Sequence, residues 1–130
     1  MKTTPQIRRI FAELLRKARQ VDPSLRVALR VGRASEFPEL RDHAYCSSQR
    51  GRIEIVIAPR MLSAAPERQA GVLAHELGHA LLFRAGLPEH AERSADEVAE
   101  RAMGKKVRYD SEDVQTFGRG KKVRPSYLPR

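Results

Sequence analysis

Cysteine is almost absent from this chain, since Cys46 is the only cysteine among its 130 residues. A single thiol excludes an internal disulfide framework and is typical of proteins that work in the reducing cytosol. Cys46 could bind a metal ion as a latency switch, but a small hydrophobic residue packed on a strand is the simpler interpretation.

Long apolar runs are also missing. No run approaches the roughly 20 residues that a membrane-spanning helix requires. The first five residues, Met1-Lys2-Thr3-Thr4-Pro5, lack a hydrophobic signal region. We therefore expect a cytoplasmic protein without a membrane segment.

Acidic residues are scarce at both ends of the chain. Residues 1–35 carry a net charge of +7, residues 36–103 a net charge of −3, and residues 104–130 a net charge of +5. Basic flanks suggest contact with nucleic acid or another polyanion, although they are often only a solvated surface. Few aromatic residues accompany these basic flanks, so a platform for stacking bases is weakly supported.

The length and the 41% apolar content fit one globular domain with a modest core. Apolar residues recur at helical spacing over residues 5–20, and they alternate with polar ones over 25–31. Short strands are expected at 43–47 and 52–58, followed by helices over 66–85 and 89–103. These elements predict an α+β fold with a small mixed three-stranded sheet, a domain over residues 1–103 and an extended basic tail over 104–130.

The most informative stretch is His75-Glu76-Leu77-Gly78-His79. Residues four apart lie on the same face of a helix, so both imidazoles can reach one metal ion. Glu76 points away from the helical face that the two histidines share. It is therefore better placed to accept a proton from water than to bind the metal. The motif is expected inside a helix that opens at Pro66 and stops before Gly86, where solvated histidines are not expected.

A catalytic zinc site takes three protein ligands and leaves one position open. Glu92 is the preferred third ligand because it follows on the next helix, and His90, Asp96 and the distant His43 compete with it. Asp96 lies four residues after Glu92 and is better suited to accept the free ring N–H of a ligating histidine. A merely solvated acidic face is the alternative for this pair.

This pattern, His75-Glu76-x-x-His79 followed by Glu92-x-x-Ala95-Asp96, resembles the gluzincin metallopeptidases, and most of all the short minigluzincins. It is also similar to the ImmA/IrrE-type metallopeptidases. The resemblance implies a zincin-like core with one Zn²⁺ held by His75, His79 and Glu92, with Glu76 polarising the water. These families usually carry a further tyrosine, histidine or arginine that steadies the oxyanion, which no motif places here.

The expected function is therefore zinc-dependent peptide-bond hydrolysis on a protein or peptide substrate. The alternative is a zinc-containing, nucleic-acid-associated binding or regulatory module with little catalysis; a protease delivered to protein on DNA is a third possibility. Two further expectations concern access to the site. The strand 52–58 could be the sheet edge that pairs with substrate or a central core strand. The basic tail could fold back across the acidic cleft and limit access.

Overall fold

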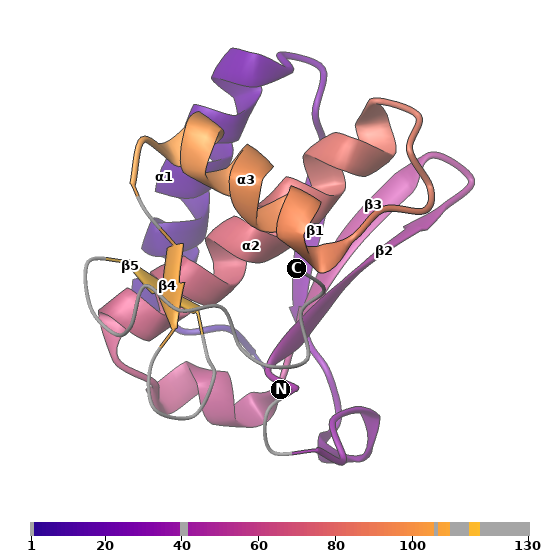
Figure 1. Cartoon of the computed structure of the whole chain (residues 1–130). Coiled ribbons are helices and arrows are strands. Elements are labelled where there is room, and N and C mark those ends of the chain that lie inside the picture. The colour runs from indigo at the N-terminus through magenta and orange to yellow at the C-terminus, as the bar shows by residue number, and fades with distance from the viewer. Residues whose placement is uncertain (1, 40–41, 106, 110–114, 118–130) are drawn as a thin grey trace.

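The computed structural model describes residues 2–39, 42–105, 107–109 and 115–117. Its α+β architecture places three helices around a mixed three-stranded sheet (Figure 1). In chain order the elements are α1 (Pro5–Val21), β1 (Val27–Val31), η1 (Ala34–Glu36), β2 (Ala44–Gln49), β3 (Arg52–Ile57), η2 (Pro59–Ser63), α2 (Pro66–Arg84), α3 (Glu92–Met103), β4 (Val107–Tyr109) and β5 (Gln115–Phe117).

The sheet has the strand order β1-β3-β2, with β1 parallel and β2 antiparallel to β3. β3 is therefore the central strand, which agrees with its almost continuous burial. The core-strand interpretation of residues 52–58 is confirmed and the edge interpretation is wrong. A continuous apolar run such as Ile53–Ile57 is typical of a strand flanked on both sides. The two edge strands are β1 and β2.

Helix α1 begins as the sequence indicates. The Thr4 hydroxyl accepts the backbone N–H of Ile7 at 3.3 Å, and Pro5 occupies the first turn. Its apolar stripe buries Ile7, Leu14 and Ala18 against the core. The expected helix over residues 5–20 is thus confirmed, with one further residue at its end.

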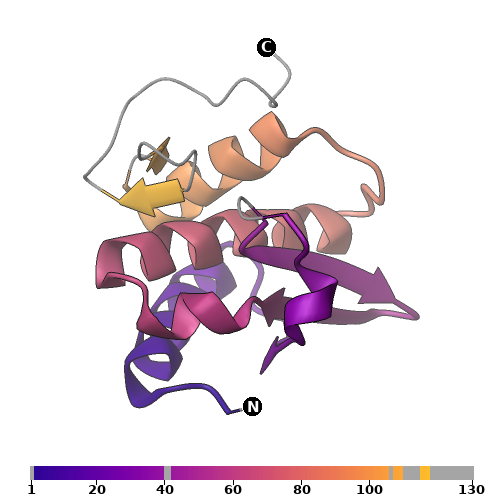
Figure 2. The same cartoon turned by 90° about the horizontal axis from the view of Figure 1, so that it is seen from below.

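Helix α2 runs through the middle of the molecule and contacts α1, α3 and the sheet (Figures 1 and 2). It lacks a single apolar stripe because its whole central part is buried, from Gly71 to Leu82. A helix covered on all sides has no solvated face on which charged side chains are stable without partners. The motif residues therefore need partners inside the protein.

Helix α3 begins at Glu92, three residues later than the expected start at 89. The loop after Gly86 (φ 83°) includes Pro88, and Ala91 keeps an extended conformation before the first turn. The strands at Val27–Val31 and Ala44–Gln49 also begin later than expected, by two residues and one residue. Leu25 is fully buried without belonging to β1.

The C-terminal segment was expected to be an extended tail. Within it, β4 and β5 form a short antiparallel pair, with β5 against α2 and β4 in contact with both α2 and α3 (Figure 1). The expectation that the tail covers the cleft concerns mostly residues 110–114 and 118–130, which lie outside the described residues.

Within the part of the chain that the structure describes, no helix has both the length and the apolar character that a membrane span requires.

Candidate metal centre

Helix α2 presents two imidazoles side by side. His75 is 2% exposed and His79 is 9% exposed. Their Nε2 atoms lie 3.1 Å apart, and the two rings meet edge to face. This is the geometry expected of residues four apart on one helical face. The spacing seen in the sequence therefore does bring the two rings together.

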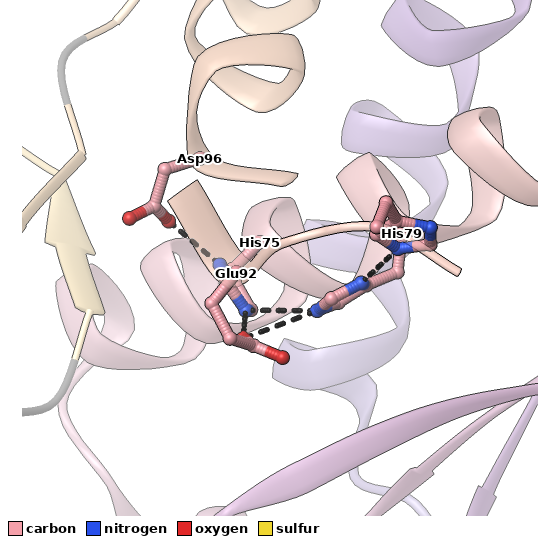
Figure 3. Close-up of polar contacts among 5 residues, drawn as sticks. His75, His79, Glu92 and Asp96 are labelled. Carbon is pink, nitrogen blue, oxygen red and sulfur yellow. Dashed lines mark hydrogen bonds and ion pairs between the residues drawn. The ribbon is translucent and has the colours of Figure 1, made fainter. Parts of the chain in front are cut away.

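Helix α3 adds a carboxylate to this pair (Figure 3). Glu92 Oε2 lies 2.6 Å from His75 Nε2 and 3.2 Å from His79 Nε2. The Glu92 side chain remains 46% exposed, so one side of the cluster opens to solvent. His75, His79 and Glu92 form a group that could hold a metal ion, with ligand atoms within 4.8 Å of one another.

Gly78 permits the close approach of α3 to α2. An ideal Cβ at this position would overlap the carbonyl oxygen of Ala95 and lie 2.9 Å from its carbonyl carbon. Ala95 is fully buried one turn after Glu92. The glycine inside the motif thus lets the second helix pack directly against the first, which places Glu92 beside the imidazoles.

The far nitrogen of each imidazole is held by a separate partner. His75 Nδ1 lies 2.6 Å from Asp96 Oδ1, and Figure 3 shows Asp96 on the side of that ring opposite Glu92. An ionised carboxylate only accepts, so the His75 Nδ1–H donates to it. The Nε2 atom of a neutral His75 then carries a lone pair directed at the cluster.

His90 fixes His79 in the same way, although it lies in the loop before α3 and not in its first turn. Its Nδ1 lies 2.8 Å from the carbonyl oxygen of Leu87, and its Nε2 lies 2.6 Å from His79 Nδ1. The carbonyl accepts from His90 Nδ1–H, so Nε2 of a neutral His90 accepts from His79 Nδ1–H. His79 Nε2 is therefore also left with its lone pair toward the cluster.

The donor set fits a cation. Two imidazole nitrogens and a carboxylate oxygen approach one another with lone pairs, an arrangement that repels unless a positive species lies between them. One proton can join only one pair of these atoms, whereas a metal ion can bind all three. Imidazole and carboxylate are borderline and hard ligands of the kind that zinc accepts.

The ionisation of the cluster follows from its surroundings. Burial lowers the pKa of His75, but its hydrogen bonds to Asp96 and Glu92 outweigh burial and raise it to about 10. The hydrogen bonds from His75 and His79 hold the pKa of Glu92 well below its ordinary value. The metal-free cluster thus favours positive charge at its centre.

Glu76 differs from Glu92 in its environment. It is 6% exposed, and burial raises the pKa of its carboxyl, against the opposing effect of His75 and His79. A carboxylate whose pKa is raised is a better proton acceptor than an ordinary glutamate. Glu76 shares the cleft with the cluster without being one of its three ligand residues.

The cleft in front of the cluster has a volume of about 720 Å³. Its walls are β2, α2 and the loop before α3, and Ala44, Tyr45 and Cys46 of β2 are among its lining residues. Burial raises the pKa of the Cys46 thiol, and the nearby Glu76 charge adds to this. Cys46 lies among core residues, as the small-hydrophobe interpretation predicts, and is not a member of the metal-binding group.

The competing third ligands lie elsewhere around the site. His43 is 7% exposed at the start of β2, where its Nδ1 accepts from Arg60 Nε at 3.3 Å. It lines the cleft but does not join the metal-binding group. Sequence reasoning rejected His90 as a ligand and missed its contact with His79. The sequence feature that could have indicated this contact is the position of His90, 11 residues after His79. At that separation His90 can reach His79 if the loop after Gly86 turns back toward α2.

A comparison with protein-family models found no match, and neither did searches of curated proteins and of solved structures.

Proposed function

We propose that this protein is a zinc-dependent peptidase whose metal is bound by His75, His79 and Glu92. The observation that carries the proposal is the convergence of three lone-pair-bearing atoms from two helices, with a buried carboxylate beside them. Two histidines and one glutamate are a ligand set of known catalytic zinc sites. The resemblance of the two motifs to gluzincins supports the same activity.

The open side of the cluster favours catalysis over a purely structural role. Structural zinc sites are closed by four protein ligands, whereas catalytic ones keep a position for water or substrate. Among the described residues the group contains three ligands, and the partly exposed Glu92 faces a cleft. This arrangement argues against a binding module in which zinc serves only to stabilise the fold.

Zinc bound here would act as a Lewis acid that polarises the scissile carbonyl and makes water a stronger acid. Glu76 would accept the proton of the attacking water and then donate it to the leaving amine. Its carboxyl lines the same cleft as the cluster, and burial raises its pKa and thus its proton affinity. Asp96 and His90 would hold the two imidazoles in the tautomers that leave Nε2 free.

The substrate that fits this cleft is an extended polypeptide. β2 is an edge strand, paired with β3 along one side, and its residues Ala44–Cys46 line the cleft. An extended chain can add to a sheet edge through main-chain hydrogen bonds that do not depend on side-chain identity. An open cleft beside such an edge suits endoproteolysis of unfolded segments.

The direct test is the Glu76→Gln variant, assayed for cleavage of a denatured protein. Loss of the proton acceptor should reduce turnover by roughly 10²- to 10⁴-fold while bound zinc stays at its wild-type amount. Glu97→Gln, an exposed position on α3, is the matched control and should behave as wild type. Cleavage by Glu76→Gln at the wild-type rate would remove Glu76 from the mechanism.

A further inference from the structure

A second depression lies at the other end of the sheet, around the β2–β3 turn. Its volume is about 1340 Å³, and it shares no lining residue with the metal cleft. Four arginines line it, contributed by α1, by the segment before β1, by the turn and by the start of β3: Arg19, Arg26, Arg50 and Arg52. We call this depression the arginine groove.

The positive charge of the arginine groove is not balanced from within. Glu54 is its only acidic lining residue, and the Glu54 carboxylate already pairs with Arg30 Nε at 3.1 Å. Arg26, Arg50 and Arg52 are exposed and form no ion pair or hydrogen bond within the described part of the chain. Arg19 is anchored through its Nε, which donates to the carbonyl oxygen of Leu25 at 2.9 Å.

The register of the sheet forces two of these arginines together. Val27 of β1 pairs in parallel with Ile53 of β3, so Arg26, just before β1, and Arg52, the first residue of β3, are neighbours at the same end of the sheet. Adjacent strands lie about 4.8 Å apart, and like charges at neighbouring positions repel. A bound anion would relieve this repulsion.

The turn supports the same interpretation. Arg50 has a φ of 51° and precedes Gly51 with a φ of 78°, as in a two-residue turn with left-handed backbone at both positions. Asn, Asp or Gly suit the first of these positions, while a residue such as arginine is disfavoured there. The turn therefore carries a third guanidinium at the rim of the groove in spite of its backbone preference.

The sheet face beneath the arginine groove is covered at its opposite end. At the opposite end, a side chain on Gly32 would overlap both Phe37 and Val56, which shows how closely the loop after β1 covers that face. Near the turn, the groove instead exposes polar side chains, among them Ser47 and Gln49. Hydroxyl, amide and guanidinium groups together are typical partners of phosphate oxygens.

From this arrangement we propose that the arginine groove binds the phosphodiester backbone of double-stranded nucleic acid. No aromatic residue lines the groove, so stacking on the bases of a single strand has no support there. The large apolar lining residues Leu25 and Ile53 are buried, and the exposed apolar ones, Pro23 and Ala28, are small, so the groove offers no large exposed apolar anchor of the kind that peptide recognition uses. The net charge of +9 adds long-range attraction to a polyanion. This binding does not depend on the proposed peptidase activity.

The test measures fluorescence anisotropy of a labelled DNA duplex with the full chain, over roughly 50 to 200 mM salt. The double variant Arg26→Gln/Arg52→Gln should bind roughly tenfold more weakly at the lower salt, and its log–log salt slope should fall by about 2. Arg9→Gln/Arg101→Gln is the matched control, because it removes the same charge from exposed positions outside the groove. Far-UV circular dichroism and thermal denaturation report whether each variant is folded, independently of any bound metal.

The control variant should keep most of the wild-type affinity. Equal losses in the two double variants would overturn the proposal, since net charge alone would then explain binding. Competition by polyglutamate as effective as that by unlabelled duplex would assign the groove to acidic peptides instead. Absence of salt-dependent binding by the wild-type chain would also contradict it.

Discussion

The metal cleft and the arginine groove are both polar depressions beside the same sheet, but their charges are handled in opposite ways. In the cleft, the two imidazoles of the metal centre are buried, and each is held by another side chain: His75 by Asp96, and His79 by His90. In the groove, the guanidinium groups are exposed, and three of the four are unpaired within the described residues. Buried, oriented ligand atoms suit a small ion and chemistry on a bond, while exposed surface charges suit a large polyanion.

The largest effect on the metal cleft is expected from Gly78→Ala, which should disturb the packing of α3 on α2. The added methyl group would overlap the Ala95 carbonyl, so α3 must shift and carry Glu92 away from the imidazoles. We expect a loss of about 1–3 kcal/mol in the free energy of unfolding and the largest loss of zinc affinity among these single variants. Thermal denaturation and zinc titration measure the two effects.

Gly104→Ala is the matched control for that substitution. A methyl group there meets no atom of the described residues within 4 Å, but the φ of 71° strains an alanine. It should therefore cost stability without changing zinc affinity. Equal zinc affinities for the two alanine variants would show that the contact at Gly78 does not position Glu92.

The second variant tests the orientation of His75. Asp96→Ala removes the acceptor of the His75 Nδ1–H, and loss of such a partner typically weakens metal binding 10- to 100-fold. Glu97→Ala, an exposed neighbour on α3, should leave zinc affinity unchanged. Zinc competition titrations distinguish the two outcomes, and an unchanged affinity in Asp96→Ala would contradict the account of the tautomer.

A smaller effect is expected from His90→Ala. His79 is more exposed than His75, so water can replace His90 as the acceptor of the Nδ1–H. We expect zinc affinity to fall by roughly threefold to tenfold, below the effect of Asp96→Ala. A loss larger than that of Asp96→Ala, measured by the same titration, would instead make His90 the more important support.

The smallest effect concerns Cys46, whose pKa is raised by burial and by the Glu76 charge. Only the thiolate reacts with alkylating reagents, so a raised pKa means that the neutral thiol persists above its ordinary titration range. Alkylation of the folded protein at mildly alkaline pH should be slow and should accelerate on denaturation. Rapid alkylation of the folded chain would show that the cleft wall at β2 is open.

The two sites also differ in how far the sequence could predict them. His75 and His79 are one helical turn apart, so spacing alone placed them together, and the same rule placed Asp96 beside the site of Glu92. The roles assigned to these residues stay predictions. The arginine groove joins residues from three separate segments, one of them in a block of net negative charge, so charge counting along the chain did not reveal it.

In the fold, the helices and the mixed sheet followed from periodicity, whereas strand order did not. The apolar run of β3 fitted both a central and an edge strand until the pairing with β1 and β2 was known. The β4–β5 pair has only three residues in each strand, too few for a periodic pattern to show. The contact of His90 with His79 depends on the path of a loop, which spacing does not fix.

The most direct test of the central claim is the metal content of the purified chain, measured by mass spectrometry of native protein after dialysis against zinc. We predict one zinc ion per chain for the wild type and none for the His75→Ala/His79→Ala variant. A wild-type chain that retains no stoichiometric metal, or a double variant that still binds one ion, would contradict the assignment of the metal centre.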